Sequence, residues 1–476
     1  MSVARIRAGR TICAAALVTV SARAQSYSVA EVGTLPDATP LVMTPPTSQA
    51  EAITESGVVA GSSAISGGSM WISPNVQIAE PWFYHAIRWT NGTVEDLGVL
   101  GQDVGPDDFP RPATYAHGIN NLQQIVGDAT VLTDGWYHAF VWLPTDAYGM
   151  SSGMHELPIL ATQAHAWAIS DYGVVVGESR LPGSLGPRAV RWDAANGQWV
   201  VSDLGSFSQA YSIAYGSNNL NQITGYATVI VPPGQSNTHA FLWLPAPAYG
   251  LPAGLNNLTA GLPAGSIGRD VNELGQVVGR GPDWRPIFWL PAPAYGLPAG
   301  VTQLSIANAF SPQVLAQYGL LAPFRGEFTG VNNHGVAVGT MDFPFQLPNG
   351  NYGTATRGIV WKNGQFLLTQ QLLPPDSAAQ YPIIYRTDES NDAGQIVATA
   401  LNANSEGRGL VLTPVPTSGD CDADMGIDLA DYQSWRTCLT GPMGAITSDC
   451  VCTDINGDND SDLADFAAFQ LGFSGP

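Results

Sequence analysis

The sequence predicts a mainly β protein: a seven-bladed β-propeller closed by its N-terminal strand, followed by a small α-helical loop-helix module. A unit of about 50 residues recurs along residues 25–416. Each unit offers four short strands, and four strands make one propeller blade. The composition then changes sharply, and residues 417–476 carry aspartates at regular spacings. These observations define the expected domains.

The chain opens with the features of a secretory signal peptide. Its first residues are basic, with Arg5, Arg7 and Arg10. A short apolar run follows at residues 11–20, and residues 22–24 fit the small-x-small cleavage rule. We therefore expect residues 1–24 to be removed on export, with an ordinary N-terminal helix as the alternative. No segment has the apolar length of a membrane span, so none is expected.

The first element of each unit reads apolar-Asn-x-x-Gly-x-x-Val-Gly. Asn or a related residue starts a tight turn, Gly takes the left-handed position, and a β-branched run forms the next strand. Gln123 and Asn221 replace the turn Gly in two copies, and Gln123 is the weaker fit because Asn tolerates that region better. The copies lie around Ile53, Ile119, Ile169, Asn218, Val271, Val331 and Asn391.

The second and third elements complete a unit. The second is His-Ala-apolar-x-Trp or a relative, whose alternation at period two predicts a strand. Its copies end at Trp89, Trp142, Trp192, Trp243, Trp289, Trp361 and Leu412. The third is a short closing strand, with copies at Leu97, Leu157, Leu204, Leu258, Leu304 and Leu372.

The last unit, ending at Leu412, has no closing strand of its own, whereas residues 30–35 carry one ahead of the first unit. A propeller closes well when one blade combines strands from both chain ends. We therefore expect the strand near Val32 to complete the seventh blade. A linear solenoid is the alternative, but it would need capped ends instead of complementary ones.

Two kinds of segment lie between these strands. Three connectors read Trp-Leu-Pro-x-x-Ala-Tyr-Gly, which predicts rigid Pro-Gly turns. A carbohydrate-stacking role is the alternative for their tyrosines, Tyr148, Tyr249 and Tyr295. Residues 305–328 lengthen one unit, and we expect a helical insert there.

These repeats, with His-Ala-Phe at their centre, resemble the extracellular HAF repeat family, and the resemblance covers most of residues 50–412. The family implies secretion and a propeller architecture. It implies no established activity, so it transfers no catalytic residues to this chain.

Charge and motifs narrow the function. The chain has 18 basic and 39 acidic residues, a net charge of -21, which argues against nucleic-acid binding. No His-Glu-x-x-His motif is present. The polar residues that recur in the units are interpreted as structural, because catalytic residues would be singular. They are His85, His138, His239, Asp96, Glu156 and Asp203.

The C-terminal segment carries the clearest chemistry. Two twelve-residue loops place side-chain oxygens at positions 1, 3, 5, 9 and 12, and a main-chain carbonyl at position 7. Calcium takes six to eight such oxygens, so we expect two calcium ions. An acidic solvated tail is the alternative. The first loop offers Asp420, Asp422, Asp424, Gly426, Asp428 and Asp431, and the second offers Asp454, Asn456, Asp458, Asp460, Asp462 and Asp465.

An amphipathic helix follows each loop, with aromatic residues three apart at Tyr432 and Trp435 and at Phe466 and Phe469. The pair of units resembles a dockerin type I module, a relative of the EF-hand, which implies a cohesin-like partner or another surface component. Position 6, usually Gly, is Met425 or Asn459. Positions 10 and 11, which in dockerins help to choose the cohesin, are apolar here. These residues, Leu429-Ala430 and Leu463-Ala464, either change the partner or are buried.

Four cysteines remain after the predicted cleavage, and all lie in this module at 421, 438, 450 and 452. In an exported protein they predict two disulfides. Cys450 and Cys452 are too close to pair comfortably, which leaves 421–450 with 438–452, or 421–452 with 438–450. Zinc binding is the alternative.

The sequence therefore favours a secreted, non-catalytic repeat protein that binds or displays ligands, polysaccharide among them, and docks through a calcium-stabilised module. The alternative is a secreted polysaccharide-degrading enzyme, a glycoside hydrolase or lyase, with a carboxylate pair on the propeller.

Overall fold

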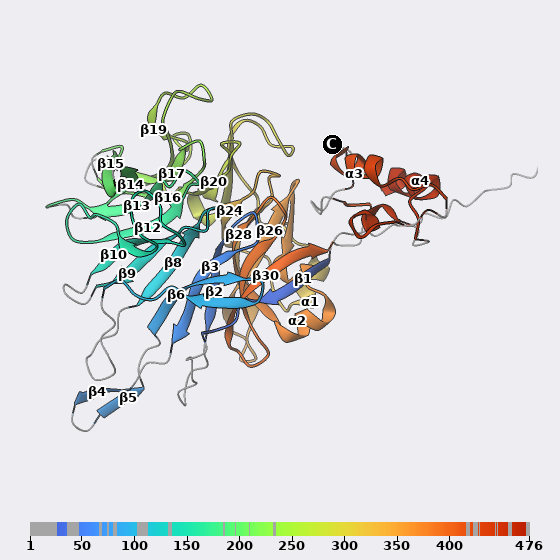
Figure 1. Ribbon diagram of the computed structural model, residues 1–476, viewed down its shortest axis with the longest axis horizontal. Helices are drawn as coiled ribbons and strands as arrows, with labels where there is room; N and C mark the ends of the chain where they lie inside the picture. The colour runs from blue at the N-terminus through green and yellow to red at the C-terminus, as the bar shows by residue number, and fades with distance from the viewer. Residues whose placement is uncertain are drawn as a thin grey trace, which may run out of the picture.

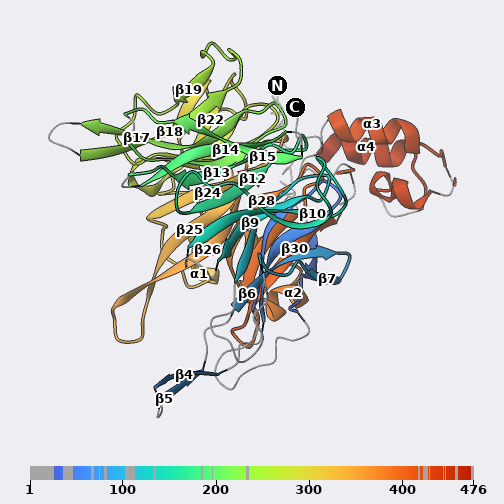
Figure 2. The ribbon, with the colours of Figure 1, turned by 60° about the vertical axis from the view of Figure 1, so that its left-hand side comes forward.

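The propeller is present, and Figures 1 and 2 show its blades beside a separate helical module. The computed structural model describes residues 26–35, 47–65, 69–73, 76–79, 83–101, 113–131, 136–183, 186–195, 197–208, 210–231, 235–415, 419–421, 427, 429–442, 444, 446–455 and 459–472. The predicted signal peptide, residues 1–24, lies outside these ranges.

Within the described ranges, seven antiparallel four-stranded sheets form the blades. Blade 1 comprises β2 (Ser48–Ile53), β3 (Val59–Ile65), β6 (Phe83–Thr90) and β7 (Thr93–Asp96). Blade 2 comprises β8 (Thr114–Ile119), β9 (Ile125–Thr130), β10 (Tyr137–Leu143) and β11 (Gly153–Glu156). Blade 3 comprises β12 (Ala164–Ile169), β13 (Val175–Arg180), β14 (Pro187–Ala195) and β15 (Gln198–Gly205). Blade 4 comprises β16 (Ser212–Ser217), β17 (Ile223–Val231), β18 (Gln235–Leu244) and β19 (Gly254–Asn257).

Blade 5 comprises β20 (Ile267–Val271), β21 (Val277–Arg280), β22 (Pro286–Leu290) and β23 (Gly300–Gln303). Blade 6 comprises β24 (Arg325–Val331), β25 (Ala337–Gln346), β26 (Tyr352–Lys362) and β27 (Gln365–Leu368). Blade 7 comprises β28 (Ile383–Ser390), β29 (Ile396–Leu401), β30 (Gly407–Val415) and β1 (Ser26–Glu31). Blade 7 confirms the predicted closure: β1 pairs with β30 in a register that sets Ser26 opposite Val415 and Glu31 opposite Leu410.

The repeated turn joins the first and second strand of every blade and also locks the blades together. Gly57, Gly173, Gly275, Gly335 and Gly394 have positive φ, as predicted, and so do their substitutes Gln123 and Asn221. Where the turn starts with Asn, its side-chain oxygen accepts from the backbone two and four residues on. Its Nδ2 donates to a turn carbonyl of the next blade, as Asn120 does to Ser170 at 2.9 Å.

The final Gly of the repeated motif makes room for a β-bulge in the innermost strand. A Cβ at Gly127 would lie 1.8 Å from the carbonyl oxygen of Tyr115, a distance that no side chain tolerates. In blade 2 the register shifts between Ala116 and Gly118, which leaves His117 as the extra residue. The five equivalent glycines meet carbonyl oxygens at 1.9–2.1 Å; they are Gly61, Gly177, Gly225, Gly279 and Gly339.

The recurring polar residues pair between the third and fourth strands, which supports the structural interpretation. His85 Nδ1 lies 2.9 Å from Asp96 and His138 Nδ1 lies 2.6 Å from Glu156. Arg188 takes the same place in blade 3 and pairs with Asp203 at 3.2 Å. His239 Nδ1 lies 3.4 Å from the Thr259 hydroxyl.

The connector tyrosines pack on neighbouring parts of the propeller. The hydroxyl of Tyr148 donates to Gln124 at 2.9 Å, and its ring contacts Trp199 edge-on. The hydroxyls of Tyr249 and Tyr295 accept from the side-chain amides of Gln222 and Gln276. These contacts account for the three residues as connectors.

Some segments differ from the prediction. The expected closing strand at Leu372 is wrong: β27 ends at Leu368, and residues 369–372 form a 3-10 helix, η2 (Thr369–Leu372). The reason is that the side-chain amide of Gln370 donates to the Tyr381 carbonyl and accepts from the Ile384 N–H. These bonds turn the chain inward at this point. The helical insert is confirmed as α1 (Pro312–Gln317), and α2 (Pro375–Gln380) was not predicted. Blade 1 also carries a hairpin, β4 (Ser69–Ser73) and β5 (Val76–Ala79), which extends away from the blades (Figure 1).

The module contains α3 (Leu429–Cys438), η3 (Ser448–Thr453) and α4 (Leu463–Gly472). The predicted aromatic residues pack between the helices, with Trp435 fully buried and its ring 5.6 Å from that of Phe466. Of the two possible connectivities, the structure has Cys421–Cys452 and Cys438–Cys450. All four thiols are therefore in disulfides, and the zinc alternative is wrong for these cysteines.

No helix within the described ranges is long and apolar enough to cross a membrane.

Candidate functional sites in the module and the propeller channel

The module holds half of the predicted calcium ligands within its described residues. Outside the described residues lie Asp422, Asp424, Gly426, Asp428, Asn456 and Asp458. Those described are Asp420, Asp431, Asp454, Asp460, Asp462 and Asp465. Four of these are buried, namely Asp420, Asp431, Asp460 and Asp465. A solvated tail would leave them exposed, so that alternative is wrong.

Each of the two loops contains the same internal hydrogen bond. The N–H of Cys421 donates to Asp431 at 2.6 Å, and the N–H of Ile455 donates to Asp465 at 2.8 Å. Both bonds join loop position 2 to the carboxylate at position 12. The module is therefore built from two equivalent halves, as the 34-residue repeat of the aspartates predicted.

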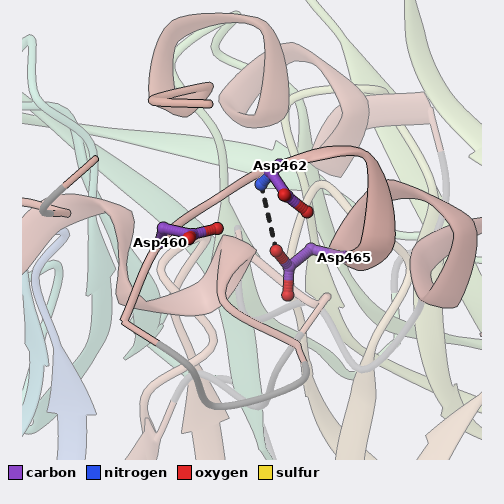
Figure 3. A group of neighbouring side chains, drawn as sticks. All are labelled: Asp460, Asp462 and Asp465. Atoms are coloured by element: carbon purple, nitrogen blue, oxygen red, sulfur yellow. Dashed lines mark hydrogen bonds between the residues drawn. The ribbon is translucent and has the colours of Figure 1, made fainter. Parts of the chain in front are cut away.

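The second loop gathers three carboxylates. One oxygen from each of Asp460, Asp462 and Asp465 lies within 4.8 Å of the others (Figure 3). Asp462 directly precedes α4: its N–H donates to Asp465 at 3.0 Å and its carboxylate accepts from the N–H of Ala464. The sequence assigned Asp460 a main-chain carbonyl, whereas the structure brings its side chain into the group.

Two further features bear on the resemblance. Asn459, at the position where Gly is usual, has φ 67° and its N–H donates to Asp454 at 2.9 Å, so Asn accommodates this turn. Leu429 and Leu463 are 60% and 80% exposed. Of the two alternatives for these leucines, burial in the module is therefore wrong.

The propeller channel gathers residues that the sequence did not single out. Each innermost strand has a bulge at the same place in the repeat, three residues before the start of the turn, and β28 has a second one between Ile384 and Arg386. The seven bulged residues are Glu51, His117, Trp167, Tyr215, Arg269, Thr329 and Asp388. All seven line one cavity of about 220 Å³. Every blade therefore contributes a different side chain to one site.

One side of this site is aromatic. The ring of Trp167 lies 4.5 Å from that of His117 and 5.6 Å from that of Tyr215. His165 and Tyr226 extend the row at 6.0 and 6.2 Å from Trp167 and Tyr215. These residues come from blades 2, 3 and 4.

The other side is made of ion pairs from blades 5, 6, 7 and 1. Arg386 lies 2.5 Å from Asp388 and 3.6 Å from Glu51. Arg269 pairs with Glu327 at 3.2 Å and lies over the ring of Tyr215. Charges of both signs therefore lie next to one another along this side.

His117 joins the two sides. Its Nδ1 lies 3.0 Å from Glu51 and its Nε2 lies 2.6 Å from Asp128, so both ring nitrogens donate to carboxylates. Burial opposes the charge on His117, but these hydrogen bonds outweigh it and raise its pKa to about 10. Burial likewise opposes ionisation of Glu51, yet the hydrogen bond from His117 holds the pKa of Glu51 below its usual value.

Two other acids, Asp388 and Asp270, have pKa values above their usual range, in contrast to Glu51. Burial raises the pKa of Asp388 to about 7, although Arg386 acts against it. Burial also raises the pKa of Asp270 to about 6. Asp388 is only 7% exposed, and its Oδ2 lacks a hydrogen-bond partner among the described residues. The same holds for two other buried polar atoms beside the cavity, Trp167 Nε1 and Ser217 Oγ.

At one end of the channel, a closed ring of hydrogen bonds joins all seven blades. The residue after each turn start donates its N–H to the side-chain oxygen of its counterpart in the next blade, at 2.7–3.0 Å. The ring runs through Glu55, Asn121, Asp171, Asn219, Glu273, Asn333, Asp392 and back to Glu55. These acids are bonded within the ring and have a structural role.

The bulge position could have been found from the sequence by its variability. Within a repeat whose turn and strand residues recur, one column reads Glu, His, Trp, Tyr, Arg, Thr and Asp. Singular residues at one repeat position are the pattern expected of a site, whereas recurring ones serve the fold.

Comparison with known proteins finds only distant structural similarity. No family model and no curated protein matches the sequence. Among solved structures, the chain is similar to the β-propeller domain of the Trilobed protease from Pyrococcus furiosus, with 9% identity, 77% of this chain and 95% of that one covered, and a TM-score of 0.39. It is also similar to a gluconolactonase from Xanthomonas campestris, with 11% identity, 64% and 89% covered, and a TM-score of 0.32. Likeness at this level carries no argument about activity.

Proposed function

We propose that this protein is a secreted, non-catalytic binding protein whose C-terminal module takes up calcium and docks to a partner, while the propeller displays a ligand site. The observation that carries the proposal is the repeated loop in the module. In both halves a buried position-12 carboxylate, Asp431 or Asp465, closes onto the start of its own loop.

The donor set fits calcium. Carboxylate oxygens are hard ligands, and three of them lie within 4.8 Å of one another in the second loop. Buried carboxylates repel one another and are costly without a cation. Bound calcium would be held by the two sets of loop residues given above and would supply the positive charge that stabilises the module.

The docking face is proposed at the starts of the two helices. Leu429 and Leu463 occupy equivalent positions and are largely exposed. Exposed apolar residues that recur by two-fold repetition favour a protein partner with an apolar surface, a cohesin-like protein or another cell-surface component. Export is supported by the predicted signal peptide and by the two disulfides, which form in oxidising compartments.

Calcium titration calorimetry on the full chain tests the calcium part. Two ions are expected to bind, and Asp465→Asn is expected to remove one of them. Asp449→Asn, which alters an aspartate outside both loops, is the matched control and is expected to leave both sites intact. Absence of calcium uptake by the wild-type chain would refute the proposal.

Surface plasmon resonance against a panel of cohesins tests the docking part. We expect calcium-dependent binding that Leu429→Asp with Leu463→Asp abolishes. Binding that survives this double variant, or that ignores chelator, would contradict the docking face.

A second candidate function is a polysaccharide-degrading enzyme, and one observation favours it. Glu51 and Asp388 both contact Arg386, and their pKa values are displaced in opposite directions, as an acid and its partner carboxylate require. Release of reducing ends from a polysaccharide panel, lost in Glu51→Gln and Asp388→Asn, would establish it. No turnover on any polysaccharide would reject it.

A further inference from the structure

The bulge cavity has two properties that a purely structural channel does not need. Its seven side chains are all different, although the turn, the Val-Gly pair and the Trp strand recur in most blades. Three polar atoms beside it, Asp388 Oδ2, Trp167 Nε1 and Ser217 Oγ, are buried without a partner among the described residues. A buried polar atom left unpaired costs stability, so such atoms point to a ligand that completes them.

The aromatic side selects a ligand with a flat apolar face. Trp167 stands between His117 and Tyr215 and lines the cavity from blade 3. Aromatic faces bind flat apolar surfaces by dispersion and burial.

The opposite side selects neutral hydroxyl groups. Arg386, Asp388 and Glu51 form one connected set of charges, and Arg269 with Glu327 forms another. Because both sets already pair positive with negative groups, an ionic ligand would meet its own charge as well as the opposite one. A hydroxyl both donates and accepts, so it can bond carboxylate and guanidinium alike.

The size limits the ligand to one ring. The cavity of about 220 Å³ is below the range of about 300–1,000 Å³ typical of drug-sized ligand pockets. A pyranose unit combines this size with an apolar face and a rim of hydroxyls.

We propose that the bulge cavity is a binding site for one neutral sugar unit, a free monosaccharide or the end of a glycan, stacked on Trp167 and hydrogen-bonded to Asp388 and Arg386. The proposal depends on neither calcium uptake nor hydrolysis. Removal of calcium is therefore expected to leave sugar affinity unchanged, which separates failure of this site from failure of the docking module.

Titration calorimetry on the full chain tests the site with D-glucose, D-galactose, D-mannose, D-xylose and N-acetylglucosamine, and with L-glutamate and L-lysine as charged probes of similar size. We expect saturable binding of at least one sugar and none of the amino acids. Trp167→Ala is expected to weaken it about tenfold or more, with Trp167→Phe retaining part of the affinity. Tyr172→Ala removes an exposed aromatic outside the cavity and serves as the matched control.

Asp388→Asn is a second test variant that keeps the size of the side chain. It tests the site independently of whether the Trp167 variants fold. It is expected to weaken sugar binding while circular dichroism stays unchanged. Binding of an amino acid instead of a sugar would overturn the ligand class. Absence of binding by every sugar, or sugar binding that neither Trp167→Ala nor Asp388→Asn weakens, would overturn the site.

Discussion

The module and the propeller channel build their sites in opposite ways. In the module, the proposed calcium ligands are contiguous: each loop takes its carboxylates from twelve successive residues, so spacing alone predicts them. In the channel, Glu51 and Asp388 meet at Arg386 although more than 330 residues separate them. A local site is visible as a motif, whereas a site assembled by closure of a ring is visible only as one variable column in a repeat.

The largest effect is expected from removing the Cys421–Cys452 disulfide of the module. Replacing Cys421 and Cys452 by Ser opens a loop of 31 residues and is expected to lower the free energy of unfolding of the module by about 3–4 kcal/mol. Calorimetric melting of the full chain should show the module transition shift while the propeller transition stays. A shift of both transitions together would mean that the two regions are not the independent units compared here.

A similar loss is expected in the propeller from Gly127→Ala. The added Cβ would meet the Tyr115 carbonyl at 1.8 Å, so the bulge that presents His117 must rearrange, at about 3 kcal/mol for overpacking. Gly261→Ala is the matched control, because nothing lies near its Cβ. Chemical denaturation measures both variants. Equal stability of the two would show that the bulge does not depend on this glycine.

The charge on His117 makes the stability of the propeller depend on pH. His117 has a raised pKa of about 10, so its charged form stabilises the folded state below its unfolded pKa near 6.5. That contribution is lost as the pH rises toward 10. We expect the unfolding free energy of the propeller to fall between pH 7 and pH 10, and His117→Gln to flatten this slope. An unchanged slope in the variant would contradict the assigned charge.

The smallest effect is expected from Asp388→Asn, which should raise the stability of the propeller at high pH instead of lowering it. The pKa of Asp388 is raised to about 7, so the folded state is favoured at low pH and loses that advantage between about pH 4 and pH 7. At pH 8 the variant should be more stable because Asn carries no buried charge, and the gain is limited to on the order of 1 kcal/mol because Arg386 loses its partner. Denaturation at pH 4 and pH 8 checks this. Destabilisation at pH 8 would mean that the ion pair outweighs burial.

Much of the fold was accessible from the sequence because the propeller repeats. Seven turns, seven central strands and the unpaired strand near Val32 predicted blade number and closure. The closing strand of blade 6 was misplaced, since tertiary hydrogen bonds of Gln370 determine where β27 ends. Disulfide pairing stayed open in the sequence because both connectivities satisfy the spacing, and only the packing of α3 against η3 and α4 selects one.

The channel site was missed for a physical reason. Whether Glu51 points into the channel or between strands depends on a bulge, and a bulge is a feature of strand pairing, not of local propensity. In the sequence, the glycine of the Val-Gly pair belongs to a turn-and-strand pattern. Its position opposite the bulge becomes clear only in the paired register.

The central claim is that the two aspartate loops hold calcium. A crystal structure of the full chain grown with calcium tests it most directly, through anomalous density at each loop. We expect two ions, one held by the first loop with Asp420 and Asp431, the other by the second loop with Asp454 and Asp465. Crystals with no ion in either loop, or with calcium only at the ring of Glu55 and Asp392, would contradict it.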